Sequence, residues 1–228
     1  MGKNALEVLY RKAEENDSDI VYGDFYEIMA DGNRYKKQPT YSNPLDAVKG
    51  MLTGYMDYNV WNKLVKRDLY LANNILFPAG YAMGEDLTMI MLFSSALKVS
   101  FVSTPVYYYD RTNPGAMTYS MSEEKQNALK HNVIMAENYL CGKYGNALKV
   151  EIATLKLNLK WPFLISTDRI SVYKEWSKWF PEANEYITSQ SVSSRIKALE
   201  LCACRKQYWI IWLHYWFVIK FYYKIFGK

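Results

Sequence analysis

The feature that most constrains the fold of this chain is a change of pattern at residues 113–115, which read Asn-Pro-Gly. Before this point, residues 20–29 read IVYGDFYEIM, a run of β-branched and aromatic residues that predicts a strand. Asp31-Gly32 follows and is typical of a tight turn, so residues 33–38 are expected to return as a polar edge strand. From Ser122 onward the sequence shows only helical patterns. The chain is therefore predicted to hold a mixed α/β region followed by an all-helical region.

Local signals place further elements of the first region. Asn43-Pro44 is typical of a helix start, because Asn is a good N-cap and Pro suits the first helical position. Residues 85–97 are apolar nearly all round, which indicates a buried helix. We expect two buried strands at residues 99–102 and 106–109, separated by Thr104-Pro105.

Composition and charge exclude several classes of protein. Of the 228 residues, 50% are hydrophobic and 22% are charged, so the chain is expected to fold rather than to be disordered. Its net charge of +5 is only mildly basic and does not indicate a nucleic-acid binder. The three cysteines, an odd number in a long chain, favour a reducing compartment. Residues 1–16 form a charged amphipathic pattern rather than a signal peptide, so we expect a cytoplasmic protein.

Four short motifs lie close together in the middle of the first region. They are Trp61-Asn62-Lys63-Leu64, Lys66-Arg67, Phe77-Pro78 and Gly84-Glu85-Asp86-Leu87. In the order and spacing of these motifs the chain resembles family-2 glycosyltransferases of bacterial polysaccharide synthesis. The likeness extends back through Gly23-Asp24-Phe25 and forward to Met117-Thr118, so that it covers about residues 1–120.

The resemblance implies a fold and a reaction. The fold is GT-A, a mixed sheet with helices on both sides, with residues 1–120 as its acceptor side and residues 121–228 as a helical extension. The reaction transfers a sugar from a nucleotide-sugar donor to a hydroxyl of a saccharide or lipid-linked acceptor, with inversion at the anomeric carbon. Such a transfer needs a carboxylate that takes the hydroxyl proton. It also needs positive charge on the departing diphosphate, usually from Mg²⁺ or Mn²⁺.

The same resemblance suggests the site residues. Asp86 is the expected general base, and Glu85 is expected to bind an acceptor hydroxyl or to hold the loop. Because neighbours on a helix point about 100° apart, only one of these two carboxylates can face the acceptor. Alternatively, both carboxylates serve only to stabilise the first helical turn through the helix dipole. The expected substrate-binding residues are Trp61, Asn62, Lys63, Gly84 and Arg111, although Trp61 also fits a core position and Arg111 a solvated loop.

The chain departs from the family pattern at its start. In the family, a helix like residues 4–16 follows the Asp-x-Asp element, which binds the metal and the donor diphosphate. This chain starts at Met1, so we expect it to lack the N-terminal donor-binding half and the metal ligands, and to be inactive alone. Asp17-Ser18-Asp19 has the right letters but stands where the family has a plain turn. Three interpretations of this start stay open: a truncated gene product, a designed or cloned fragment, and a partner of a separate chain that carries the N-terminal half. An alternative function is a non-catalytic membrane-associated fragment or partner subunit.

The C-terminal tail, from about residue 205 to residue 228, is aromatic and basic. Its central part, residues 207–226, reads QYWIIWLHYWFVIKFYYKIF and belongs to a helix expected over about residues 192–225. His214, Lys220 and Lys224 interrupt the apolar run, which is short for a bilayer crossing. Trp and Tyr favour the headgroup region, and lysines suit an acidic surface. We therefore favour a helix lying on the inner face of the plasma membrane over one packed on the protein or one that spans the membrane.

Overall fold

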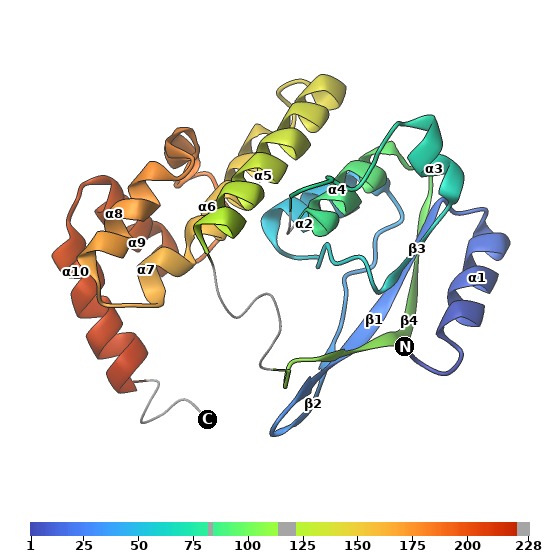
Figure 1. Ribbon diagram of the computed structural model, residues 1–228, viewed down its shortest axis with the longest axis horizontal. Coiled ribbons are helices and arrows are strands. Elements are labelled where there is room, and N and C mark those ends of the chain that lie inside the picture. The colour runs from blue at the N-terminus through green and yellow to red at the C-terminus, as the bar shows by residue number, and fades with distance from the viewer. Residues whose placement is uncertain (82–83, 114–121, 223–228) are drawn as a thin grey trace. The chain divides into compact units, whose positions relative to one another are not determined.

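The computed structural model describes residues 1–81, 84–113 and 122–222, with the backbone alone at residues 85, 86 and 222 (Figure 1). The chain divides into two compact units, Met1–Ala147 and Leu148–Lys228. The first unit is mixed α/β and the second is helical, which confirms the predicted fold class. The helix over residues 123–144 lies with the first unit.

The first unit is built around one central strand. Strand β1 (Ile20–Met29) pairs antiparallel with β2 (Gly32–Lys36) and β3 (Lys63–Val65), and parallel with β4 (Val99–Asp110). The sheet is therefore mixed, and β2 is the exposed edge strand that the Asp31-Gly32 turn predicts. The helices of this unit are α1 (Ala5–Asn16), α2 (Pro44–Thr53), α3 (Arg67–Ala72), α4 (Glu85–Ser95) and α5 (Glu123–Tyr144).

Helices cover both faces of the sheet because successive β1 side chains point to opposite sides. Val21 packs with Ala5 and Leu9 of α1 in one buried cluster. Its neighbour Tyr22 instead meets Phe93 of α4, with ring centroids 5.9 Å apart. Figure 1 shows α1 on one side of the strands and α2 and α4 on the other.

Strand β4 is a single element, whereas the sequence predicted two strands on either side of Thr104-Pro105. The register against β1 slips at this point, from Gly23↔Val102 to Asp24↔Pro105. Proline is tolerated at such a bulge because the ladder locally loses its hydrogen bonds there. A Cβ on Gly23 would lie 2.9 Å from Val106 Cγ1, so the bulge requires a glycine opposite it.

The second unit packs short helices around buried aromatic rings. Its elements are α6 (Lys149–Lys160), α7 (Pro162–Ile165), α8 (Ile170–Lys178), the 3₁₀-helix η2 (Pro181–Tyr186), α9 (Ser194–Cys204), α10 (Tyr208–His214) and the π-helix η3 (Tyr215–Tyr222). Trp176 and Trp179 are buried, and the fully buried Lys160 ammonium lies 3.9 Å from the centroid of the Trp176 ring. Lys160 Nζ also donates to the Trp179 carbonyl over 2.9 Å. Burial lowers the pKa of Lys160 to about 8.

The single last helix predicted over residues 192–225 is wrong, because the chain breaks between α9 and α10. Lys206 adopts the left-handed conformation with φ of 58°. The amide of Gln207 donates to the Cys202 carbonyl over 2.8 Å, which closes the end of α9 in the manner of a C-cap. In the described ranges, no helix is long and apolar enough to cross a membrane.

Candidate functional site

Alternate residues of two neighbouring strands place a group of side chains on one face of the sheet. In the β1–β4 register, Phe25 lies opposite Tyr107 and Glu27 lies opposite Tyr109. Residues two apart on a strand share a face, so these four side chains form two adjacent rows. Arg111 extends the second row just beyond the end of β4.

Trp61 packs on these rows. Its indole stacks on Tyr107 and Tyr109, with centroid distances of 4.5 and 5.1 Å, and meets the edge of Phe25 at 4.6 Å. Trp61 is nevertheless only partly buried. The sequence left open a core position and a substrate-binding position, and the structure gives Trp61 a packed place at the rim of a pocket.

The segment that carries Trp61 is held by its two following residues. Asn62 is buried, and its side-chain amide donates to the Gly23 carbonyl of β1 over 2.7 Å. Lys63 Nζ donates to the carbonyls of Asp57 and Asn59 and to Asn62 Oδ1, over 2.9, 2.6 and 2.8 Å. Both side chains thus fix the 57–63 segment against the sheet.

An open pocket of about 280 Å³ lies beside Trp61. Arg111 Nε lies 3.2 Å from Glu27 Oε1, and the Arg111 guanidinium lies 5.4 Å from the centroid of the Tyr109 ring. The pocket combines aromatic surface with carboxylate, amide and cationic groups, a mixture that fits a small polar ligand with apolar faces. Its lining consists of Phe25, Glu27, Lys36, Asp57, Asn59, Trp61, Tyr109 and Arg111.

A series of hydrogen bonds leads from Asp24 to Asp57, one of the residues that line the pocket. The buried carboxylate of Asp24 accepts from the Tyr35 hydroxyl and from the Gln38 amide. The Gln38 side chain in turn donates to Asp57 Oδ2 over 2.8 Å. The hydrogen bond to Asp24 raises the pKa of Tyr35 to about 12. The carboxylate of Asp57 is therefore oriented by a chain of contacts that begins in the Gly23-Asp24-Phe25 motif.

Gly84 precedes α4 at a crowded point. A Cβ at this position would lie 2.2 Å from Pro78 Cγ and 2.6 Å from Asn132 Nδ2, so no other residue fits without a shift. Gly84 therefore sets the start of α4 and does not line the Trp61 pocket. Glu85 and Asp86 are the first two residues of α4, and their side chains lie outside the described part of the chain. Met117-Thr118 also lies outside the described residues.

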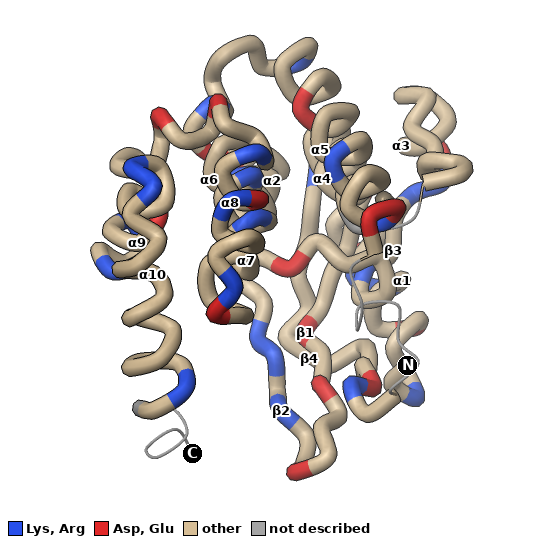
Figure 2. Tube along the Cα trace, turned by 60° about the vertical axis from the view of Figure 1, so that its left-hand side comes forward, with Lys and Arg blue, Asp and Glu red and all other residues tan. Residues whose placement is uncertain are grey.

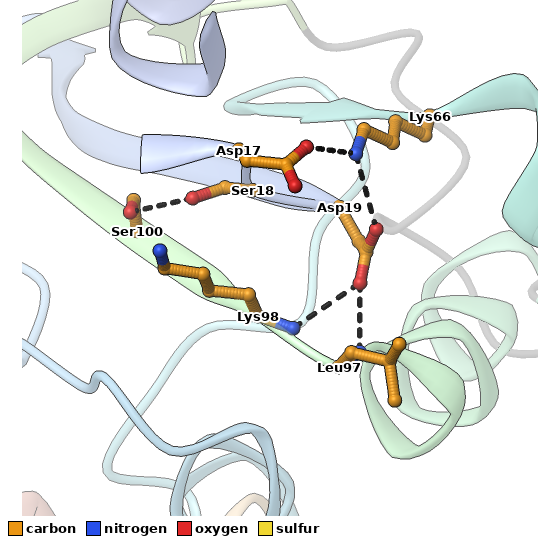
Figure 3. Close-up of polar contacts among 7 residues, drawn as sticks. All are labelled: Asp17, Ser18, Asp19, Lys66, Leu97, Lys98 and Ser100. Atoms are coloured by element: carbon orange, nitrogen blue, oxygen red, sulfur yellow. Dashed lines mark hydrogen bonds and ion pairs between the residues drawn. The ribbon is translucent and has the colours of Figure 1, made fainter. Parts of the chain in front are cut away.

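The acidic turn at Asp17-Ser18-Asp19 is engaged in contacts within the protein (Figure 3). Lys66 Nζ lies 2.9 Å from Asp17 Oδ1 and 3.5 Å from Asp19 Oδ1. Asp19 Oδ2 accepts from the amides of Leu97 and Lys98 over 2.7 and 3.1 Å. The turn thus ties α1 to strands β3 and β4. Residues 1–81, 84–113 and 122–222 contain no group of three or more His, Cys, Asp or Glu side chains that could hold a metal ion.

The structure brings together some of the expected site residues and adds others. Trp61 and Arg111 line one pocket, whereas Asn62, Lys63 and Gly84 do not line it. Sequence reasoning missed Glu27 and Asp57, since a carboxylate on a strand or in a loop carries no motif of its own. Phe25 and Glu27 are two residues apart on β1 and therefore share a face of the strand. This spacing is the one signal that would have placed Glu27 on the same face as the aromatic side chains.

Part of the chain is similar in sequence to proteins of known function. No family model matches the chain. A cholesterol galactosyltransferase of Borreliella burgdorferi is 33% identical over 144 residues, which span 57% of this chain and 39% of that protein. The glycosyltransferase GlyG of Streptococcus pneumoniae is 25% identical over 127 residues, 50% of this chain and 42% of that protein. These relatives are glycosyltransferases. The chain spans about two-fifths of the length of each.

Solved structures support the fold. The crystal structure of Staphylococcus aureus TarS, residues 1–349, matches 93% of this chain and 62% of that chain, with a TM-score of 0.59 and 15% identity. The same protein in complex with UDP-GlcNAc matches with a TM-score of 0.51 and 16% identity, over 93% of this chain and 64% of that chain. At this level of identity the similarity to TarS concerns the fold alone. The similarity to glycosyltransferases rests on the two sequence relatives.

Proposed function

We propose that this chain is the acceptor-side part of an inverting glycosyltransferase of family 2 with a GT-A fold. The proposed reaction moves a hexose from a nucleotide sugar to a hydroxyl of a saccharide or lipid-linked acceptor in cell-surface polysaccharide or glycolipid synthesis. The observation that carries the proposal is the pocket lined by Trp61, Glu27, Asp57 and Arg111, because it combines aromatic surface with carboxylate and cationic groups. The similarity to two glycosyltransferases supports it.

The pocket offers the contacts that a sugar ring needs. Trp61 and Tyr109 present aromatic surface for the apolar face of the ring. Glu27 and Asp57 are hydrogen-bond acceptors for sugar hydroxyls, and the Asn59 side chain is both donor and acceptor. The Arg111–Glu27 pair fixes the direction of that carboxylate. We assign these residues to binding and orientation of the sugar.

Asp86 is proposed as the general base and Glu85 as a contact to an acceptor hydroxyl. In this role the Asp86 carboxylate takes the proton of the attacking hydroxyl as its oxygen bonds to the anomeric carbon. The backbone supports such a role, since both residues begin α4 directly after the tightly packed Gly84.

A divalent metal, Mg²⁺ or Mn²⁺, would supply positive charge to the departing diphosphate in the complete family domain. The described residues do not fit such a metal, because Asp17 and Asp19 are paired with Lys66 and backbone amides. We propose that the metal ligands and the nucleotide site belong to residues outside this chain, in a longer protein or a separate chain. This chain alone is then inactive.

A transfer assay combined with a thermal melt tests this proposal. The purified chain is incubated with nucleotide sugars and saccharide acceptors, and its melting temperature is followed with Mn²⁺ and a panel of nucleoside diphosphates. We expect no transfer and no shift from nucleotides, but an upward shift from an acceptor saccharide that Trp61→Ala removes. A ligand at a hundred times its Kd adds about 2.7 kcal/mol of stability, which a melt detects. A nucleotide-dependent shift would contradict the missing donor site, and indifference to every saccharide would contradict the acceptor role.

The second candidate function is a non-catalytic membrane-associated fragment or partner subunit. The exposed aromatic side chains of α10 and η3 favour it. It predicts lipid binding without affinity for nucleotides or saccharides. In either function we place the chain at the inner face of the plasma membrane, where a lipid-linked acceptor would lie.

A further inference from the structure

The end of the second unit exposes a continuous row of large apolar side chains. On α10 and η3, Trp209, Phe217 and Phe221 are 63%, 66% and 61% exposed. The exposed residues of this row follow one another at intervals of one, three or four positions, so that they share one helical face. The row consists of Trp209, Trp212, Leu213, Trp216, Phe217 and Phe221.

The opposite face of the same segment is committed to the core of the unit. Ile211 and Tyr215 are buried, and Tyr208 shares a hydroxyl contact of 3.3 Å with Ser177 of α8. The Tyr208 ring also lies 6.4 Å from the ring of Tyr173. Because this packing anchors one side of the segment, the exposed row is a stable feature of the folded unit and is directed away from the core.

The charge around the row has one sign. Residues 201–228 contain five Lys and Arg residues and no Asp or Glu. Figure 2 shows no acidic colour on the tube of α10 and its continuation η3, and basic colour near the end of η3. Arg205 and Lys206 are exposed at the turn before α10, and Lys220 is exposed near the other end of the row with its Nζ 5.7 Å from the centroid of the Tyr215 ring. Basic groups thus flank the aromatic row at both ends.

We propose that the Trp209–Phe221 face is a docking surface for a bilayer that contains anionic phospholipid. Tryptophan and phenylalanine rings enter the boundary between headgroups and acyl chains, while the flanking lysines stay at the level of the lipid phosphates. Charge complementarity decides the occupant, since an acidic lipid surface neutralises the basic residues of the tail. A second copy of the chain would bring the same positive charges together, which opposes association through this face.

The segment lies on the surface rather than crossing it, because its other side is packed against α8 and α9. This inference rests on the membrane association in the proposed function, for which it names the docking surface and the class of lipid. Membrane binding is measured without sugar transfer, so the docking surface and the glycosyltransferase role can fail separately.

Vesicle flotation of the complete chain tests the docking surface. The wild type is mixed with vesicles of phosphatidylcholine alone and with vesicles that also contain phosphatidylglycerol. The test variant carries Trp209→Ser, Phe217→Ser and Phe221→Ser. The control variant carries Tyr10→Ser, Leu71→Ser and Leu97→Ser, three similarly exposed positions in the first unit, at 59%, 60% and 91%. Circular dichroism checks that both variants keep their helices.

We expect the wild type and the control to float with anionic vesicles, and the test variant to lose roughly tenfold or more in partition. A charge variant, Lys206→Glu with Lys220→Glu, keeps the aromatic row and is expected to lose roughly fivefold or more per residue on anionic vesicles. Equal flotation of the wild type and the test variant would overturn the proposal. So would failure of the wild type to float, or an aromatic-dependent dimer in sedimentation with no vesicle binding. Equal binding to neutral and anionic vesicles would overturn the assignment to anionic lipid.

Discussion

The indole of Trp61 stacks on the ring of Tyr109, with the centroids 5.1 Å apart and the planes inclined by 9°. This contact joins the segment before β3 to the end of β4 and forms one wall of the pocket. The two residues are 48 positions apart in the sequence, so the pocket exists only when the sheet is complete.

Removal of the Trp61 ring is expected to destabilise the first unit. Trp61→Ala loses the contacts with Phe25, Tyr107 and Tyr109, and we expect the free energy of unfolding to fall by about 2–4 kcal/mol. Denaturant unfolding followed by circular dichroism measures this loss. Trp209→Ala, at a 63% exposed position, should change the stability by no more than about 0.5 kcal/mol. Equal effects of the two changes would argue against a packed Trp61.

A methyl group at Gly84 is expected to disturb the start of α4. Gly84→Ala places a Cβ 2.2 Å from Pro78 Cγ, and we expect a loss of about 1–3 kcal/mol in stability. Gly142→Ala is the matched control, because it lies in α5 with no atom within 4 Å of the added Cβ. That change should stabilise the helix by about 0.5–1 kcal/mol. Thermal melts of both variants give the comparison, and a neutral Gly84→Ala would show that the loop before α4 adapts.

The sequence predicted most of the fold because its signals were local. Asn43 and Ser122 were expected at helix starts, and their side chains accept the capping hydrogen bonds from Leu45 and Lys125. The two strands predicted on either side of Pro105 are one strand in the structure. A proline normally ends a strand, but Pro105 lies at a bulge whose position depends on pairing with β1. The sequence did not indicate that a helix ends at Lys206, because the left-handed residue at a helix end is usually a glycine.

The site was harder to predict than the fold. The motif around Trp61 lies in the segment that lines the candidate pocket, but only pairing between β1 and β4 brings Glu27 and Arg111 together. Asn62 and Lys63 belong to the same motif, and their contacts hold the 57–63 segment in place. The tertiary structure therefore divides the residues of this one motif between the candidate pocket and the contacts that support it.

The stability of the second unit is expected to depend on pH through Glu200. Burial raises the pKa of this carboxyl from 4.5 to about 7. Between these values the folded state holds more protons than the unfolded state, so the contribution of Glu200 to stability is lost as the pH rises. Relative to wild type, Glu200→Gln should gain on the order of 2–3 kcal/mol between pH 5 and pH 7.

Unfolding free energies of the wild type and Glu200→Gln at several pH values measure this gain. The comparison cancels other groups that titrate in both proteins. Glu124→Gln, at an exposed position in α5, is the control for a Glu-to-Gln change outside the second unit. A constant difference between Glu200→Gln and wild type across this range would contradict the raised pKa.

Titration calorimetry of wild type and Glu27→Gln with saccharides tests whether the Trp61 pocket binds an acceptor. We expect at least one hexose-containing acceptor to bind to the wild type. Loss of the Glu27 carboxylate should weaken it by roughly tenfold, since a hydrogen bond to a charged group contributes about 1.5–3 kcal/mol. Glu124→Gln should leave the affinity unchanged. Saccharide binding that ignores Glu27→Gln would contradict the assignment of this pocket, and the absence of binding to any acceptor would contradict an acceptor-side glycosyltransferase unit.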